Sequence, residues 1–426
     1  MKQVLVIQLA RMGDLLQSKR LIASLQAEGN TQVHLLVDES LQSFACWVYP
    51  QCIVHSILAS MPSLQSLSDV FHDPVITGRL LDTYRTQLNP LKEISFSTVY
   101  LLNSSPLSLI LARLFKAEQC QGFWVDKGQP GRSHWVRLTE RFTEHRGTSP
   151  LNLIDYWAYF HPHPIAPSMV NPLPQKAGEN RIGVVLSGQQ PRRSLPPSVL
   201  ALCMEALFEG RKGPSFILLG TEAEQRNARA VLRLLPAPIA QRTKDLTGKT
   251  RLLDLPDIFA GLDMLITPDT GLMHLGAHCG VPVQAFFLSS AWCFETGPYG
   301  LGHTVWQAVE PCSPCLEIAP CPHEVQCLSP FRSTPFLQYL RGKFDENWPS
   351  NLCGFVSRFD ALGGTYTLVD GVDRYANLRA QKRALAQEFL YTSMTPTAPV
   401  STTGQEVGEA VYRERDWLLP ERRERG

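Results

Sequence analysis

The sequence predicts an α/β protein made of two consecutive doubly wound halves. Three observations predict it: short apolar segments alternate with helical patterns over residues 1–165, a proline-rich stretch interrupts them, and the alternation begins again at Arg181. Strands that alternate with helices are typical of parallel sheets covered by helices. With 426 residues and 44% hydrophobic content, the chain is long enough for two or three such cores.

The first half, residues 1–165, begins with an apolar segment that ends before a glycine-containing turn, which is the pattern of a buried strand followed by a helix. We expect strands and helices at Val4–Leu9, residues 15–25, Val33–Val37, Val99–Leu102 and Leu107–Phe115. Arg11 and Asp14 break the first apolar stretch, and no small-residue cleavage site follows it. The N-terminus is therefore predicted to be a strand rather than a signal peptide, and the protein to be cytoplasmic.

Residues 166–180 are proline-rich and polar, as expected of a linker. The second half, residues 181–345, repeats the rhythm of the first. Its expected elements are Ile182–Leu186, Ser198–Leu207, Phe216–Leu219, Leu255–Leu262, Met264–Thr267, Thr270–His278 and Val281–Phe287. Residues 346–426 are expected to form an irregular extension with one helix at Arg374–Leu390 and a charged, disordered tail. Contact of that tail with an anionic surface is the alternative.

The charge balance limits the classes of partner. Forty Lys and Arg residues stand against 39 Asp and Glu, for a net charge of +1. A dedicated nucleic-acid-binding protein usually has a strongly basic face, so we expect no nucleic-acid partner. No apolar run approaches the ~18 residues that span a bilayer.

The strongest chemical signal is the run from Asp269 to His274, which directly follows a predicted strand. Asp is a favoured N-cap, so we expect Asp269 to cap the following helix. The first N–H groups of a helix lack intrahelical partners and carry partial positive charge, which suits a phosphate at Thr270 and Gly271. His274, one turn further, is the expected hydrogen-bond donor to phosphate or sugar. An ordinary capped helix is the alternative.

A second candidate anion site is the loop 187–193, which also follows a predicted strand. Ser187 and Gly188 are small, and Arg192 and Arg193 end the loop with guanidinium groups that can engage diphosphate oxygens bidentately. A solvated surface loop is the alternative. Neither a dinucleotide-binding glycine motif nor a P-loop occurs, which disfavours a dehydrogenase or an NTPase.

Asp14 lies at the carboxyl end of the first predicted strand. A carboxylate there could remove a proton from an attacking hydroxyl, a role worth typically 10²–10⁴ in rate. It could equally cap the helix that begins beside it.

Eleven cysteines in a chain of this length do not indicate a disulfide scaffold. Four of them, Cys312, Cys315, Cys321 and Cys327, fall within the proline-rich loop 311–328. Four soft ligands are sufficient for a structural zinc or iron ion. Reduced thiols that pack the loop are the alternative.

Taken in order, these motifs resemble glycosyltransferase family 9, whose best-known members are the ADP-heptose:lipopolysaccharide heptosyltransferases. The matching runs lie at residues 4–14, 216–224, 245–250, 262–277, 296–300 and 312–315, so the resemblance covers about residues 1–330. It implies the GT-B architecture, two Rossmann-like domains with the active site in a cleft between them. It also implies an inverting transfer from a nucleotide-diphosphate sugar that requires no metal cofactor for catalysis.

The resemblance implies roles for single residues. Asp14 matches the general base, and Arg192 and Arg193 match a basic loop that meets the donor diphosphate. Glu222 matches the acidic residue near the nucleoside. The run at Asp269, Thr270, Gly271 and His274 matches the donor-binding segment.

The resemblance implies ADP-heptose as donor and a lipopolysaccharide core as acceptor, with peripheral contact to the inner membrane. The chain departs from the family at Ser194-Leu195, where tryptophan is usual, and in its longer tail. Some relatives heptosylate protein serines and carry a cysteine-bound iron. A protein acceptor is therefore an alternative, as is a non-catalytic protein that binds sugar nucleotides or serves as a scaffold.

Overall fold

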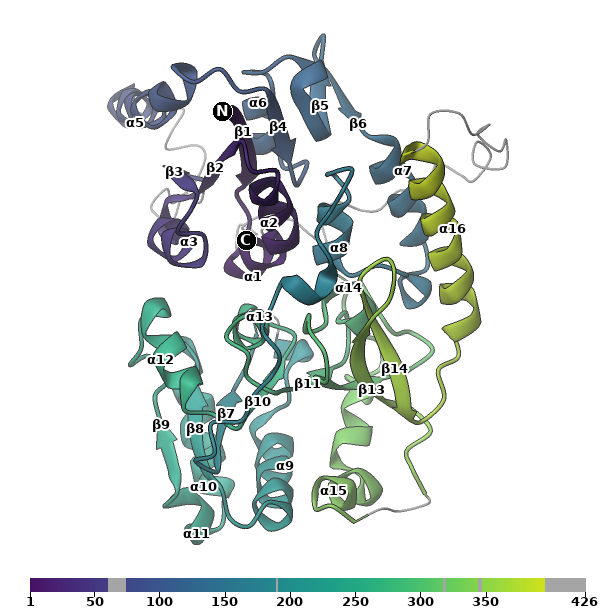
Figure 1. Ribbon diagram of the computed structural model, residues 1–426. Helices are drawn as coiled ribbons and strands as arrows, with labels where there is room; N and C mark the ends of the chain where they lie inside the picture. Colours follow the sequence, from purple (N-terminus) through teal and green to yellow (C-terminus); the bar gives the residue numbers. More distant parts are fainter. Residues whose placement is uncertain (60–73, 189–190, 317–318, 344–346, 395–426) are drawn as a thin grey trace. The chain divides into compact units, whose positions relative to one another are not determined.

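The computed structural model describes residues 1–59, 74–188, 191–316, 319–343 and 347–394 (Figure 1). Within these ranges the chain forms two compact units. Unit 1 comprises residues 1–138 and 157–165, and unit 2 comprises residues 139–156 and 166–394. Each unit contains one sheet. Two α/β halves, as the alternating pattern predicted, are therefore confirmed.

The sheet of unit 1 has the order β3-β2-β1-β4-β5-β6. Pairing is parallel from β3 to β5 and antiparallel between β5 and β6. Val4, Leu5 and Val6 of the central strand are fully buried, which explains its continuous apolar run. The strands are β1 (Lys2–Gln8), β2 (Thr31–Asp38), β3 (Ile53–Ile57), β4 (Thr98–Leu101), β5 (Cys120–Asp126) and β6 (Gln129–Arg132).

The helix expected over residues 15–25 is interrupted at Ser18, which ends α1 and precedes α2. The helices that begin in unit 1 are α1 (Met12–Gln17), α2 (Lys19–Ala27), α3 (Gln42–Val48), α5 (Pro74–Lys92), α6 (Pro106–Ala112) and α7 (His134–Phe142). Helix α8 (Leu153–Ala158) spans the boundary between the two units.

The sheet of unit 2 has the order β14-β13-β12-β11-β10-β7-β8-β9. Strands β7 to β12 pair in parallel, and β13 and β14 pair antiparallel at one edge. The strands are β7 (Arg181–Val185), β8 (Ser215–Leu219), β9 (Thr243–Asp245), β10 (Met264–Pro268), β11 (Val283–Phe287), β12 (Thr304–Ala308), β13 (Leu352–Phe359) and β14 (Gly364–Asp370). The helices are α9 (Pro197–Gly210), α10 (Gln225–Leu234), α11 (Ala237–Ala240), α12 (Leu255–Ala260), α13 (Gly271–His278), α14 (Cys293–Thr296), α15 (Thr334–Leu340) and α16 (Ala376–Met394).

Both faces of this second sheet are buried in separate apolar clusters. Phe286 belongs to one cluster together with α9 and α15, whereas Val283, Ala285 and Phe287 of the same strand belong to the other, with α13 and α14. Successive residues of a strand point to opposite faces, so a strand covered on both sides is mostly apolar. All residues of β11 are buried, and only Gln284 among them is polar.

Residues 352–370 differ from the irregular extension that we expected after residue 345. They form the β13–β14 hairpin, and β13 adds to β12, with Val305 opposite Phe355. The helix expected at Arg374–Leu390 is present as α16. The charged tail that we expected to be disordered lies outside the described residues, as do Gln189 and Gln190 of the loop after β7.

In each sheet the strand order reverses at the first strand of the unit. Strand β1 lies between β2 and β4, and β7 lies between β8 and β10. Open α/β sheets bind ligands outside the carboxyl ends of the strands at such a reversal. Asp14 follows β1, residues 186–188 follow β7, and Asp269 follows β10. The topology thus places the candidate residues at the carboxyl ends of the strands, where open α/β sheets generally bind ligands.

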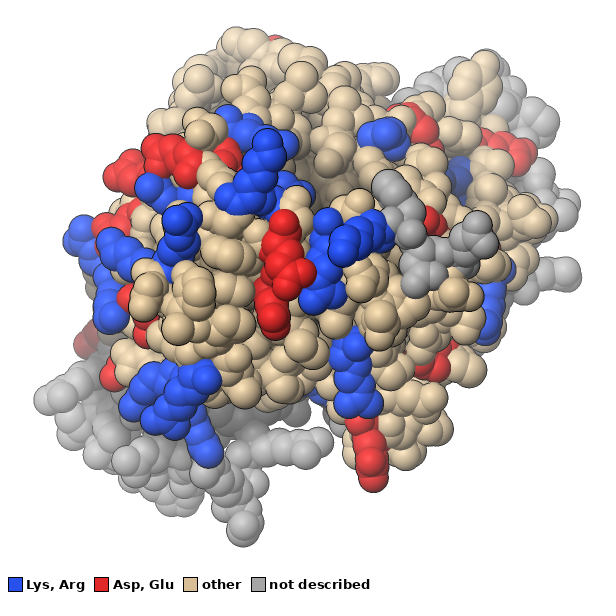
Figure 2. All heavy atoms as spheres, turned by 90° about the horizontal axis from the view of Figure 1, so that it is seen from below, with Lys and Arg blue, Asp and Glu red and all other residues tan. Residues whose placement is uncertain are grey.

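Two observations bear on partners. Within the ranges that the structure describes, no helix has the length and hydrophobicity to traverse a lipid bilayer. On the face shown in Figure 2, Lys and Arg side chains lie among Asp and Glu side chains.

Candidate functional site

Two loops meet at the strand reversal of unit 2. A Cβ atom on Gly188 would lie 2.9 Å from Cγ2 of Thr270 and 3.4 Å from the carbonyl oxygen of Asp269. The Gly188 N–H donates to the Ser194 hydroxyl at 2.9 Å, which fixes the loop after β7 in this position. The backbone of this loop therefore lies directly against the start of α13, and only glycine leaves room for that approach.

Asp269 is not the N-cap that we expected. Thr270 occupies that position with extended backbone angles, and α13 begins at Gly271. The Asp269 carboxylate instead accepts hydrogen bonds from the Arg193 guanidinium and from the Thr296 hydroxyl, the latter at 2.8 Å. The Asp269 carboxylate is only 5% exposed, and a buried carboxylate requires a charged or hydrogen-bonding partner. Asp269 therefore pairs with Arg193 of another loop instead of capping α13.

The start of α13 has the features of an anion site. Thr270, Gly271 and Leu272 are half-buried, whereas residues 273–277 of the helix are buried. The first N–H groups of a helix have no intrahelical acceptor, and they carry the positive end of the helix dipole. A phosphate at this partly exposed helix start would therefore be bound by backbone donors.

His274 lies one turn into α13 and is 7% exposed. Burial lowers the pKa of its imidazole to about 4, so the ring is neutral at pH 7. Its Nδ1 atom is buried and has no hydrogen-bond partner among the described residues. A neutral imidazole offers one donor and one acceptor, so His274 can form a hydrogen bond without adding charge.

The two arginines of the loop after β7 make different contacts. Arg193 pairs with Asp269, while Arg192 donates to the carbonyl oxygens of Leu316, at 2.6 Å, and Ala319. Leu316 and Ala319 belong to the cysteine-rich loop. The structure therefore brings Arg193, rather than both arginines, to the start of α13.

Glu224 contacts the loop after β7. The Ser187 hydroxyl donates to Glu224 Oε1 at 3.1 Å, and Glu224 Oε2 accepts from the Thr221 hydroxyl at 2.6 Å. Glu222 is exposed, and its Cα would lie 3.1 Å from a Cβ on Gly248, so it stands beside the turn that follows β9. Sequence reasoning missed Glu224, although its place three residues after Thr221 is a capping signal.

Asp14 lies in unit 1, in the first turn of α1, and is half-buried. Its Oδ2 accepts the backbone N–H of Arg11 at 3.2 Å. The capping interaction that the sequence left open therefore occurs. Gln8, at the end of β1, donates to the Ser18 hydroxyl at 3.3 Å and accepts from Asn103 at 3.3 Å, so polar groups surround the end of this strand.

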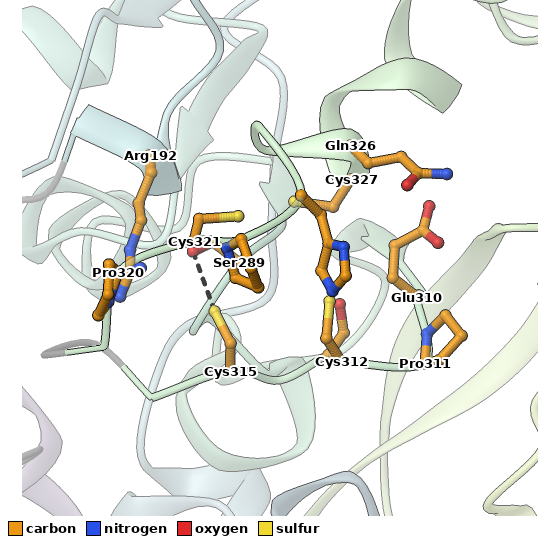
Figure 3. A pocket seen from close by; sticks show the side chains of 13 residues that line it. Arg192, Ser289, Glu310, Pro311, Cys312, Cys315, Pro320, Cys321, Gln326 and Cys327 are labelled. Carbon is orange, nitrogen blue, oxygen red and sulfur yellow. Dashed lines mark hydrogen bonds between the residues drawn. The ribbon is translucent and has the colours of Figure 1, made fainter.

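The four cysteines of the loop 311–328 line one cavity of about 260 Å³ (Figure 3). Burial raises the pKa of Cys327 to about 11, and backbone N–H groups of His323 and Val325 lower the pKa of Cys321. The sulfur of Cys315 lies 3.4 Å from the Ser289 hydroxyl. All four are free thiols. Although thiolates suit zinc or iron, no three His, Cys, Asp or Glu side chains in the described ranges are arranged to hold a metal ion.

Comparison with protein families identifies part of unit 2. Residues 208–324 match the model of glycosyltransferase family 9 (heptosyltransferase). This matched stretch lies entirely within unit 2. It includes Asp269, the start of α13 and three of the four loop cysteines. The resemblance predicted from the ordered motifs is confirmed, and with it the assignment of the chain as a glycosyltransferase.

Several solved structures are similar to this chain. The Escherichia coli heptosyltransferase WaaC with ADP matches with a TM-score of 0.51 at 15% identity, over 70% of this chain and 91% of its own. The ADP-heptose lipopolysaccharide heptosyltransferase II of E. coli matches with a TM-score of 0.48 at 18% identity, over 70% and 88%. The iron-containing dodecameric glycosyltransferase TibC of enterotoxigenic E. coli matches with a TM-score of 0.45 at 11% identity, over 80% and 75%. The WaaC likeness confirms the predicted GT-B fold; no curated protein matches the sequence.

Sequence reasoning also missed Ser194 and Thr296, which hold Gly188 and the Asp269 carboxylate in place. Thr296 begins one of the family 9 motifs, so its position was marked but its role was not. Ser194 stands where the family usually has tryptophan, and its hydroxyl accepts the Gly188 N–H.

Proposed function

We propose that the chain catalyses the inverting transfer of heptose from ADP-heptose to a lipopolysaccharide core-type acceptor. The observation that carries the proposal is the partly exposed start of α13, which lies within the family 9 segment and is contacted by Gly188 and paired through Asp269 with Arg193. The presence of ADP in the WaaC structure supports an adenine nucleotide donor. We assign donor binding to Ser187, Gly188, Arg192, Arg193, Glu222, Asp269, Thr270, Gly271 and His274.

The donor site would act on the leaving group. Negative charge develops on the nucleotide diphosphate as the bond to the anomeric carbon breaks. Backbone N–H groups at Thr270 and Gly271 and the guanidinium of Arg193 are oriented before the reaction, so they can stabilise that charge without reorganisation. Loss of one such donor commonly costs roughly 10²–10³ in turnover.

Asp14 is the general base of the proposed mechanism. An alcohol has a pKa far above 7, so its proton must be removed as the new bond forms. The proton would pass from the acceptor hydroxyl to the Asp14 carboxylate while the oxygen attacks the anomeric carbon from the face opposite the diphosphate. The hydrogen bond from the Arg11 N–H orients this carboxylate.

The acceptor sets the expected location. A lipid-linked core would be glycosylated in the cytoplasm by an enzyme that contacts the inner membrane peripherally. Glycosylation of a protein serine instead would be seen as a mass increase on a protein substrate.

The cysteine-lined cavity carries a separate structural proposal, a bound zinc or iron ion held by Cys312, Cys315, Cys321 and Cys327. Four soft sulfur donors around one cavity support it, although the side chains would have to move closer together to coordinate an ion. Elemental analysis of the purified protein and of a Cys312→Ser/Cys315→Ser variant tests the proposal. Equal, substoichiometric metal in both would reject it.

The function is tested by incubating the protein with ADP-heptose and a heptose-deficient core acceptor, beside a panel of other sugar nucleotides. Heptosylated core is the expected product. Turnover with a different sugar nucleotide alone would reject the donor assignment, and binding without any turnover would favour a non-catalytic scaffold.

The base is tested with Asp14→Asn, which keeps the size of the side chain. We expect kcat to fall by roughly 10²–10⁴ while ADP affinity stays unchanged. Asp254→Asn is a matched control, because Asp254 also accepts the backbone N–H of an arginine three residues earlier, Arg251, at 2.8 Å. Equal turnover of the Asp14 variant and the control would exclude Asp14 as the base.

A further inference from the structure

Arg146 is far in sequence from the family motifs, yet its guanidinium contacts three segments of unit 2. Its guanidinium donates to Oε2 of Glu295 through Nε at 3.0 Å and Nη2 at 2.6 Å. Nη2 also donates to the carbonyl oxygen of Ser290 at 2.9 Å, and Nη1 donates to that of Cys315 at 3.2 Å. The side chains of Arg146 and Glu295 are 16% and 2% exposed. One half-buried arginine thus joins the loop after β11, helix α14 and the cysteine-rich loop.

These three segments lead back to the start of α13. Glu295 is followed by Thr296, whose hydroxyl donates to Asp269. On the other side, the cysteine-rich loop continues from Cys315 to Leu316, whose carbonyl oxygen accepts from Arg192, the neighbour of Arg193. Arg193 closes the path by pairing with Asp269. The contacts form a closed ring within unit 2, hereafter the arginine ring: Arg146, Glu295, Thr296, Asp269, Arg193, Arg192, Leu316 and Cys315.

We propose that Arg146 is a positioning residue for the nucleotide-diphosphate site, acting through the arginine ring; this inference rests on the proposed function. In the arginine ring, Asp269 and Arg193 are the residues that would face the nucleotide. Arg146 is not one of them, but it is connected to them by two routes. One runs through Thr296 and the other through the cysteine-rich loop. Its planar guanidinium serves four hydrogen bonds from fixed directions, so it sets the position of both routes at once.

The charges explain why the ring would hold its shape. The Glu295 and Asp269 carboxylates are buried and each is paired with an arginine. Removing a partner from a buried pair leaves an uncompensated charge, so the surrounding groups rearrange to find another partner. A disturbance at Glu295 would therefore displace the adjacent Thr296 and, through it, the Asp269 carboxylate that orients Arg193.

The test is Arg146→Lys, which keeps the positive charge but offers a compact ammonium on a flexible stem in place of the guanidinium fork. We expect the dissociation constant of ADP, measured by isothermal titration calorimetry, to rise roughly tenfold, since small misplacements at a binding site are costly. Arg383→Lys is the matched control. Arg383 also pairs with a carboxylate, Asp360, and donates to a carbonyl of the 139–156 segment, that of Pro150, but it lies outside the ring.

A second variant separates positioning from general stability. Thr296→Val removes the hydroxyl that contacts Asp269 without leaving a charge unpaired. If Arg146 acts through the ring, the combined loss of ADP affinity in Arg146→Lys/Thr296→Val is smaller than the product of the two single losses. Should the lysine variant fail to fold, Glu295→Gln replaces it in the same cycle.

The outcomes distinguish the inference from the function. ADP affinity in Arg146→Lys equal to that of Arg383→Lys, or independent effects in the double variant, would overturn the positioning role and leave the proposed function intact. A wild-type protein that binds neither ADP nor another nucleoside diphosphate would reject the proposed function, and the positioning role with it.

Discussion

The contact between Gly188 and Thr270 allows a stringent test of the donor site. Gly188→Ala adds one methyl group at the point where the loop after β7 meets the start of α13. That Cβ would lie 2.9 Å from Cγ2 of Thr270. Ordinary carbon contacts are longer, about 3.5–4.0 Å, so one of the two segments must move by roughly half an ångström or more. Because threonine is branched at Cβ, its methyl group cannot swing away freely.

The cost follows from the crowding. Extra methyl groups in well-packed places cost typically 1–3 kcal/mol. If that energy is paid only when the nucleotide is bound, ADP affinity falls roughly 5- to 150-fold, since 1.4 kcal/mol corresponds to a factor of ten. If the free protein is equally crowded, the melting temperature falls instead. Calorimetric titration with ADP and thermal unfolding, measured on the same preparation, separate these two possibilities.

The compensating variant makes the test decisive. Thr270→Ser removes Cγ2 and keeps the hydroxyl, which lies 3.4 Å from that of Thr267. In the double variant the nearest remaining atom would be the Asp269 carbonyl oxygen, at 3.4 Å. We expect Gly188→Ala/Thr270→Ser to recover most of the ADP affinity that Gly188→Ala loses. Unchanged ADP affinity and stability in Gly188→Ala, or no recovery in the double variant, would refute the reasoning.

Three further predictions concern charge and burial. Asp269→Asn breaks the ion pair with Arg193, and we expect the free energy of unfolding to fall by roughly 1–3 kcal/mol. Thermal or denaturant unfolding measures this loss, and no loss would mean that the pair does not contribute to stability. Arg192→Gln frees the carbonyl oxygens of Leu316 and Ala319, so the thiols of the cysteine-rich loop should react several-fold faster with a chromogenic aromatic disulfide, and an unchanged rate would contradict the contact. Burial lowers the pKa of His303 to about 4, below the 6.5 of an unfolded chain, so its contribution to stability is complete above pH 6.5 and is lost as the pH falls toward 4. His303→Gln should flatten this dependence by up to about 1.4 kcal/mol per pH unit in melts between pH 7 and pH 5, and an unaltered slope would exclude His303 as its source.

Much of the fold could be predicted because strands buried on both faces can be recognised in the sequence as apolar runs. The positions of β1, β7, β10 and β11 follow from such runs, and so does the parallel pairing that alternating helices require. The β13–β14 hairpin could not be predicted in this way. No helix separates β13 from β14, so the alternation of strands with helices that marked the rest of unit 2 is missing there. In addition, β14 contains half-exposed and exposed residues and therefore does not form an apolar run.

The candidate site could also be predicted only in part. The sequence marked the loop after β7 and the start of α13, since small residues, arginines and a helix start after a strand are local features. It assigned Asp269 to capping because that role needs only neighbours in the chain. The structure shows instead a pair with Arg193, 76 residues away, and a contact with Thr296, 27 residues away.

The sequence by itself determined the positions of the apolar central strands, and hence which polar residues follow the carboxyl ends of those strands. These properties depend on periodicity and on local backbone chemistry, which are written in consecutive residues. Only the tertiary structure decided which of those residues meet, as with Arg146 and Glu295, which are 149 positions apart. Many arginines and carboxylates could form such a pair, and the one that forms is selected by the packing of the sheet and its loops, which no stretch of neighbouring residues contains.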